Sequence, residues 1–213
     1  MTTRIVGRVA LVWGLVIAAG GTAFAQRTSP FSFNMIVSPG AATCLPNATA
    51  HVKIVSRGAG TAEDMAVSAS GLPANTDFDF FVIQVPNKPF GLAWYQGDVD
   101  TDSNGNAFQR FRGRFSIETF IIGQGVAPAP QTFTQPPFPD ALQNPVTIGP
   151  DGVTAGPVQT YHLGMWFNSP TDAQNAGCAN TVTPFNGTHN AGIQVLNTAN
   201  FPDTLGPLSQ FKP

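Results

Sequence analysis

Apolar and polar residues alternate with a period of two in several short segments of the 213-residue chain, as in strands that are half buried in a sheet. Residues 49–55 show this most clearly, and their pattern predicts that Ala50, Val52 and Ile54 point inward. Further strands are expected at 31–37, 64–70, 90–96, 116–122, 146–148, 158–167 and 192–198. Residues 78–85 are apolar on both faces, which places that strand in the middle of a sheet rather than at an edge.

The Asn104-Gly105 dipeptide lies between two alternating segments and predicts a β-hairpin with a two-residue type I′ turn. In the register that this turn sets, Trp94 lies opposite Phe115. The expected inward face then holds Leu92, Trp94, Phe111, Phe115 and Ile117, and the outward face holds Tyr95, Arg110, Arg112 and Arg114. A slip of one residue would set the apolar side chains against the arginines, so the pattern favours this register.

One short helix is expected at 170–176. Ser169 is a suitable N-cap, Pro170 suits the first helical position, and Gly177 is a typical stop. Short strands separated by turn signals, with no alternation of strands and helices, predict an all-β fold. We expect an antiparallel β-sandwich of the immunoglobulin-like or jelly-roll Greek-key type, and a β-barrel is the alternative.

The N-terminus has the features of a signal peptide. Arg4 and Arg8 precede an apolar run at 9–19, and Ala23-Phe24-Ala25 forms a small-residue cleavage site. We predict removal of residues 1–25, which leaves 26–213 as one secreted or periplasmic domain without a membrane-spanning segment. Within that domain, the proline-rich residues 126–145 are expected to run over the surface in an extended conformation.

The chain has 2 cysteines, Cys44 and Cys178, and in an exported protein an even pair predicts one disulfide. Closing a loop of this length stabilises the fold by roughly 4–5 kcal/mol in the chain-entropy model. The bond also predicts that the N-terminal region lies beside the segment that precedes the last strand.

Charge narrows the range of partners. The 10 basic and 12 acidic residues give a formal net charge of −2, and loss of Arg4 and Arg8 with the signal peptide makes the charge more negative. Nucleic acid is therefore not expected as a partner. Another exported protein or a surface glycan is the kind of partner that fits an exported domain.

A hairpin tip rich in oxygen ligands raises a metal hypothesis. Asp98, Asp100, Asp102 and Asn104 alternate, and residues 100–105 match the start of an EF-hand calcium loop. The match ends at the twelfth loop position, where Phe111 stands in place of a glutamate. These four residues are the candidate calcium ligands, and turn formation by Asp and Asn is the alternative explanation. No other cofactor is indicated.

The 3 histidines, His51, His162 and His189, would suit a transition-metal site if the fold brought them together. None of them stands at a ligand spacing typical of zinc motifs. We therefore expect His51 on an exposed strand, His162 half buried in a sheet and His189 in a turn.

No recognisable catalytic motif is present. The sequence lacks a G-x-S-x-G elbow, and both cysteines are assigned to the disulfide. Carboxylates that could serve a glycosidase are Glu63, Asp64, Asp77, Asp79 and Glu118, and their spacing does not distinguish a pair. We interpret the protein as non-enzymatic, with a metal-binding module and a hydrolase as the alternatives.

Three segments carry a resemblance to other proteins: GLPANTDFDFFVIQVPNKPFGLAWYQGD, TDSNGN and YHLGMWFNSPTDAQNAGC. They are similar to segments of small exported bacterial proteins of uncharacterised function. The resemblance implies an exported bacterial β-domain and brings no activity with it. The functional hypothesis is thus a domain that binds or has a structural role outside the cytoplasm.

Overall fold

The computed structural model of the protein describes residues 30–57, 62–117, 119–123, 147–148, 154–184 and 189–211. The strands are β1 (Phe31–Val37), β2 (Thr49–Arg57), β3 (Ala62–Ser70), β4 (Asp77–Ile83), β5 (Ala93–Asp100), β6 (Ala107–Gly113), β7 (Thr119–Gly123), β8 (Thr147–Ile148), β9 (Thr154–Gln159), β10 (His162–Phe167) and β11 (Gln194–Asn197). The helical segments are α1 (Pro170–Asn175) and the short 3-10 helices η1 (Phe115–Ile117) and η2 (Pro207–Gln210). The predicted signal peptide at 1–25 and the proline-rich segment at 126–145 lie outside the described residues.

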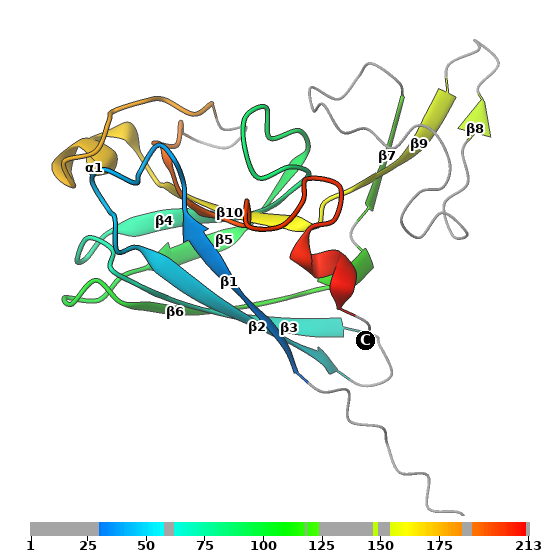
Figure 1. Ribbon diagram of the computed structural model, residues 1–213, viewed down its shortest axis with the longest axis horizontal. Coiled ribbons are helices and arrows are strands. Elements are labelled where there is room, and N and C mark those ends of the chain that lie inside the picture. The colour runs from blue at the N-terminus through cyan, green and yellow to red at the C-terminus, as the bar shows by residue number, and fades with distance from the viewer. Residues whose placement is uncertain are drawn as a thin grey trace, which may run out of the picture.

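Eight strands form one sheet in the order β5-β4-β10-β11-β1-β2-β3-β6, and β7, β9 and β8 form a small second sheet (Figure 1). Every strand pair is antiparallel. The large sheet curls nearly back on itself, so that β5 and β6, its two edges, approach each other near the turn that joins them. The prediction of an antiparallel all-β fold is confirmed.

The core lies inside the curl of this sheet. Ala50, Val52 and Ile54 of β2 are buried, as predicted, and so are Met65, Val67 and Ala69 of β3. Phe80 of β4 stacks on Phe111 of β6, with ring centroids 5.1 Å apart, although these strands stand at opposite ends of the strand order. The sheet therefore closes around its own apolar face, and β4 pairs on both sides, as its two-faced apolar pattern predicted.

The predicted hairpin register is wrong. Trp94 lies opposite Val82 of β4 rather than opposite Phe115, because β5 pairs with β4 while β6 pairs with β3. Trp94 is 54% exposed instead of buried. Phe111 and Phe115 are buried as expected, so the apolar pattern located the inward face of β6 but not its partner strand.

The turn at the hairpin tip explains this difference. The Asp102 carboxylate accepts hydrogen bonds from the backbone N–H groups of Asn104 at 2.8 Å and Asn106 at 2.9 Å. Gly105 has φ of 74° and its N–H donates to the carbonyl oxygen of Asp102, which is the pattern of a three-residue loop with a bulge rather than a type I′ turn. A Cβ at Gly105 would lie 2.0 Å from the carbonyl oxygen of Leu72, so only glycine fits.

One further prediction needs correction. The expected strand at 158–167 is divided at residues 160–161, and its parts, β9 and β10, belong to different sheets. In the C-terminal tail, Leu208 and Phe211 are buried, whereas Leu205 is 51% exposed. Apolar and polar residues alternate on both sides of the break at 160–161. This pattern therefore does not reveal that the chain passes from one sheet to another.

The helix and the disulfide are confirmed. Ser169 caps α1 by accepting from the backbone N–H of Asp172, and Gly177 ends the helical turn with φ of 76°. Cys44 and Cys178 are joined, and their Cα atoms lie 5.2 Å apart. As the bond predicted, the first described strand lies beside the last one, since β1 pairs with β11. No helix among the described residues is long and apolar enough to cross a membrane.

Candidate functional site

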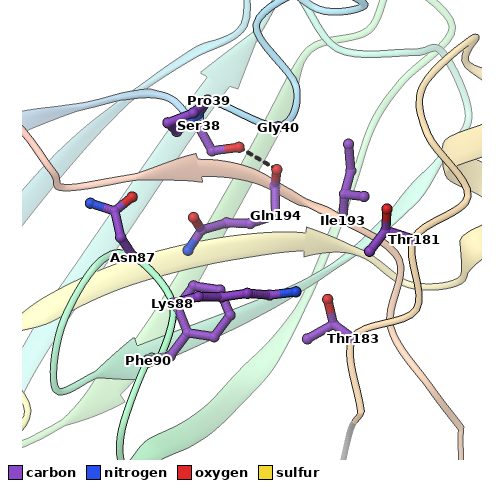
Figure 2. Close-up of a pocket in the computed structure, with 10 residues that line it drawn as sticks. All are labelled: Ser38, Pro39, Gly40, Asn87, Lys88, Phe90, Thr181, Thr183, Ile193 and Gln194. Carbon is purple, nitrogen blue, oxygen red and sulfur yellow. Dashed lines mark hydrogen bonds between the residues drawn. The ribbon is translucent and has the colours of Figure 1, made fainter. Parts of the chain in front are cut away.

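A cavity of about 290 Å³ lies beside β11, where the turn after β1, the loop between β4 and β5 and the segment after α1 meet (Figure 2). The turn after β1 contributes Ser38, and the loop between β4 and β5 contributes Lys88 and Phe90. Thr181 and Thr183 come from the segment after α1. The cavity is thus assembled from parts of the chain that are distant in sequence.

Buried hydrogen bonds hold the wall of the cavity in place. The Ser38 hydroxyl donates to the backbone carbonyl of Gln194, and the Ser38 N–H donates to the carbonyl of Val195 at 2.8 Å. The side-chain amides of Gln194 and Asn197 both donate to the Pro86 carbonyl, at 3.1 and 3.2 Å. Since these groups anchor the β4–β5 loop to β11, the cavity is largely preformed.

Among the described residues that line this cavity, Lys88 is the only one with an ionisable side chain. Figure 2 shows its side chain lying across Phe90, with the ammonium directed toward Thr183. No ion pair or hydrogen bond of this ammonium is formed with the described residues. The Phe90 ring is fixed from behind by edge contact with Trp166, at a centroid distance of 5.0 Å. The cavity therefore combines a cation, hydroxyl groups and an aromatic surface.

A second polar group lies on the outward face of β4 and β5, and we call it the acidic ladder. It consists of Asp77, Asp79, Asp98 and Asp100, which form two directly opposed pairs, Asp77 with Asp100 and Asp79 with Asp98. Asp79 is 1% exposed, and neither of its carboxylate oxygens has a hydrogen-bond partner. Tyr95 donates its hydroxyl proton to Asp98.

The surroundings of the acidic ladder shift two of its pKa values. Burial, followed by the charge of Asp98, raises the pKa of Asp77 to about 6. Burial also raises the pKa of Asp79 to about 6, against the opposing effect of His189, whose Nε2 lies 3.6 Å from Oδ2 of Asp79. Both carboxyl groups are therefore harder to ionise than an ordinary aspartate.

The predicted calcium ligands separate into two groups in the structure. Asp98 and Asp100 face Asp79 and Asp77 across β5 and β4, whereas Asp102 points into the hairpin tip and holds the turn. The backbone N–H groups of Asn106 and Asn104 lower the pKa of Asp102. Calcium binding by Asp98, Asp100, Asp102 and Asn104 stays a prediction, and the structure adds Asp77 and Asp79 as neighbours of the first two.

The three histidines have separate environments. His51 bonds to Asn34 on an exposed strand face at 2.8 Å, and His189 pairs with Asp79. His162 is completely buried, Nδ1 contacts the Thr198 hydroxyl at 2.9 Å, and burial lowers its pKa. In the described ranges, no three or more His, Cys, Asp or Glu side chains gather as ligands of one metal ion.

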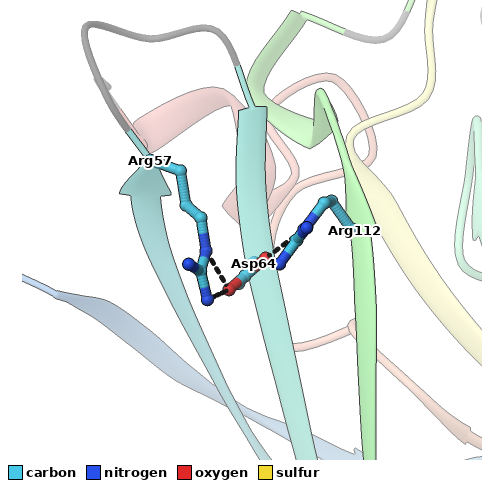
Figure 3. A network of polar contacts seen from close by, with 3 residues as sticks. All are labelled: Arg57, Asp64 and Arg112. Atoms are coloured by element: carbon cyan, nitrogen blue, oxygen red, sulfur yellow. Dashed lines mark hydrogen bonds and ion pairs between the residues drawn. The ribbon is translucent and has the colours of Figure 1, made fainter.

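A third polar group joins three strands of the opposite part of the sheet (Figure 3). Asp64 of β3 pairs with Arg57 of β2 and with Arg112 of β6, the latter at 2.9 Å. Hydrogen bonds from Arg57 and then Arg112 lower the pKa of Asp64. Glu63 is buried and accepts from the Ser116 backbone N–H at 2.9 Å. Both carboxylates are thus used in structural contacts; Glu118 lies outside the described residues.

Sequence reasoning missed the residues of the cavity. Lys88 stands between Pro86 and Pro89, and these prolines mark a short loop but give no sign of what the loop faces. Thr181 and Thr183 belong to a segment without periodicity. Asp77 and Asp79 were recognised as carboxylates, but only the pairing of β4 with β5 shows that they oppose Asp100 and Asp98.

Comparisons with protein-family models and with curated proteins found no match for this chain.

Proposed function

We propose that this protein is an exported, non-enzymatic binding module that holds an acidic sugar unit of a glycan in the cavity beside Lys88. Its framework is the curled antiparallel sheet, and the site lies beside β11 where connections from different parts of the chain meet. The observation that carries the proposal is the Lys88 ammonium, which has no partner among the described residues and lies beside hydroxyl groups and an aromatic ring. The disulfide and the lack of a spanning helix in the described residues are compatible with an extracellular or periplasmic location.

Each wall of the cavity matches one part of an acidic sugar. The ammonium of Lys88 complements a carboxylate, and such charge-assisted hydrogen bonds are stronger than neutral ones. Thr181 and Thr183 offer hydroxyl groups that both donate and accept, which suits the hydroxyls of a sugar. The ring of Phe90 offers a flat apolar surface for the C–H face of a pyranose. A volume of about 290 Å³ suits one sugar unit rather than a long chain.

The composition of the lining favours binding over hydrolysis. General acid and base catalysis needs two titratable groups on either side of the reacting bond, and Lys88 is the one titratable group among the described lining residues. The Ser38 hydroxyl is engaged by the Gln194 carbonyl rather than by a base. A metal-binding module is the second candidate function, and the acidic ladder is the observation that favours it.

Binding can be tested by calorimetric titration of the protein, produced by expression of the full-length chain, with uronic-acid oligosaccharides and with their neutral counterparts. We expect heat with the acidic series only. Lys88→Met should weaken binding by roughly tenfold or more, because the carboxylate loses its charged partner. Phe90→Ala should weaken it as well.

Lys53→Met is the matched control, since Lys53 is exposed on β2 and does not line the cavity. Its affinity should equal that of the wild type. Equal affinity of wild type and Lys88→Met, or equal binding of neutral and acidic sugars, would show that Lys88 does not select the ligand. No heat with any sugar of the acidic series would refute the proposal.

A further inference from the structure

One wall of the cavity belongs to a segment that folds back on itself. Thr181 and Thr183 line the cavity from this segment. The backbone N–H of Thr183 donates to the carbonyl oxygen of Ala191 at 2.8 Å, and the two residues form an isolated antiparallel bridge. Ala191 is buried in a small apolar cluster with Phe81 of β4 and Trp166 of β10. The position of Thr183 therefore depends on how Ala191 and its neighbours are fixed to the large sheet.

His189 connects the same stretch of chain to β4. Its Nε2 lies 3.6 Å from Oδ2 of Asp79, and we call these two residues the wall pair. The Asp79 side chain is 1% exposed and that of His189 is 38% exposed, so the wall pair joins a buried carboxylate of the sheet to a surface segment. Water screens a buried charge less than an exposed one, which strengthens the attraction. The attraction requires that Asp79 is ionised and that His189 is protonated.

We propose that the wall pair holds the wall formed by Thr181 and Thr183 in place, and that pH controls this contact. Neither member of the pair lines the cavity, so both are positioning residues. The effect on ligand binding rests on the proposed function. In that function an acidic sugar meets the threonine hydroxyls while its carboxylate contacts Lys88, and a displaced wall removes the hydroxyl contacts. The wall pair thus adds regulation to the site beside Lys88.

The groups around Asp79 set the pH at which the wall pair is lost. Asp98 of β5 lies directly opposite Asp79 and accepts the hydroxyl proton of Tyr95, and Asp77 precedes it on β4. On the other side β10 contributes the uncharged indole of Trp166. Burial raises the pKa of Asp79 to about 6, against the charge of the imidazole. This carboxyl therefore takes up a proton about two pH units above an ordinary aspartate.

The contact should be strongest between about pH 6 and pH 7 and weaken on either side. Below this range Asp79 takes up a proton and loses its charge, and above it a histidine ordinarily loses its proton. Protonation of Asp79 does not unfold the chain. Its folded pKa of about 6 lies above the unfolded value of about 3.9, so the proton binds more tightly to the folded state and this group favours folding as pH falls. The change at acid pH is thus confined to the wall.

The test follows hydrogen exchange of the Thr183 amide by NMR, without ligand, in protein produced from the full-length chain. This N–H makes the bridge to Ala191, so its protection factor reports how firmly the wall is held. From pH 4.5 to pH 8.5, and after correction for the intrinsic rate, protection should pass through a maximum and fall by roughly threefold to tenfold at each end. His189→Gln and Asp79→Asn should give low protection that does not depend on pH. His189→Lys, which keeps its charge to higher pH, should restore protection at pH 8.5 only.

His51→Gln is the matched control, because His51 is exposed on β2, bonds to Asn34 and does not line the cavity. Its profile should equal that of the wild type. Thr183 protection that does not change with pH in the wild type overturns the proposal. So does the same profile in the wild type and in His189→Gln.

The effect on binding is measured by calorimetric titration with a uronic-acid oligosaccharide at pH 5.0, 6.5 and 8.5, where a sugar carboxylate stays ionised. Affinity should be highest at pH 6.5 and roughly threefold to tenfold lower at the other two values, and this dependence should be absent in His189→Gln. Affinity that stays constant while Thr183 protection changes would overturn the regulation of the cavity. No heat at any pH would refute sugar binding, and the exchange of Thr183 then decides the role of the wall pair by itself.

Discussion

Two carboxylates of the same sheet, Asp64 and Asp79, have opposite surroundings. Asp64 lies between Arg57 and Arg112, one on each neighbouring strand. Asp79 has a carboxylate, Asp98, opposite it on one side and an indole ring on the other. Each aspartate stands in a strand that pairs on both sides, so its local backbone does not distinguish them. The residues placed across from each carboxylate decide whether its charge is favoured by two arginines or opposed by burial and a second carboxylate.

The pKa values follow this difference. Arg57 and Arg112 lower the pKa of Asp64, so its charge is favoured in the folded state. Burial raises the pKa of Asp79 to about 6, so its charge is disfavoured. A cation beside Asp79 would do for that group what the arginines do for Asp64.

The largest effect is expected from giving Asp64 the surroundings of Asp79. Arg112→Asp replaces an ion pair by a like-charge pair directly across the strands. The free energy of unfolding should fall by about 1–2 kcal/mol, from the lost pair and the new repulsion together. Urea denaturation measures it. Arg114→Asp, on the exposed end of the same segment and not paired with Asp64, should leave stability within about 0.5 kcal/mol of wild type. Equal losses in the two variants would mean that net charge, and not the pairing, is responsible.

A smaller effect is expected from the reverse exchange. Asp98→Lys places a cation opposite Asp79 and should raise the free energy of unfolding by about 0.5–1 kcal/mol in chelator, since it turns a repulsive pair into an attractive one. Asp203→Lys makes the same change in charge away from the acidic ladder and serves as the comparison. A gain in both variants, or in neither, contradicts the interpretation that Asp98 opposes the charge of Asp79.

The smallest effect is expected for the pH dependence that Asp64 gives to the free energy of unfolding. The side chains of Arg57 and Arg112 are 54% and 65% exposed, so water weakens their ion pairs with Asp64. The pKa of Asp64 is lower in the folded state than in the unfolded chain, so its contribution is fully present above the unfolded value of about 3.9. It is lost as pH falls below that value. The stability gap between wild type and Asp64→Asn, measured by urea denaturation from pH 7 to pH 3, should therefore be constant at first and then shrink. A gap that widens toward pH 3 would contradict this assignment.

Local signals predicted the elements that depend on local physics. Alternation marked the inward residues of β2 and β3, because side chains of a strand point to opposite faces whatever the partner is. The cap at Ser169 and the stop at Gly177 located α1 for the same reason. The pairing of the only two cysteines required no geometry at all. Strand alternation and helix capping depend on contacts within a few residues, and two cysteines allow only one pairing.

The partner of each strand was not predictable in this way. Asn104-Gly105 indicated a hairpin, but the Asp102 carboxylate draws the chain into a different turn, and the two arms then separate to pair with β4 and β3. Side-chain alternation is the same for any antiparallel partner. It therefore could not place Trp94 opposite Val82, nor could it bring Lys88 of one loop beside Thr183 of another.

The amino-acid sequence alone thus determined an antiparallel β-protein with one capped helix and one disulfide. Tertiary structure alone decided which carboxylates face arginines and which face one another, and which loops enclose a cavity. The physical reason is that strand periodicity and helix capping act between neighbours in the chain, whereas charge pairing and cavity formation depend on residues that meet only when the sheet curls. Asp64 and Asp79 look alike in the sequence, and the strands beside them make them different.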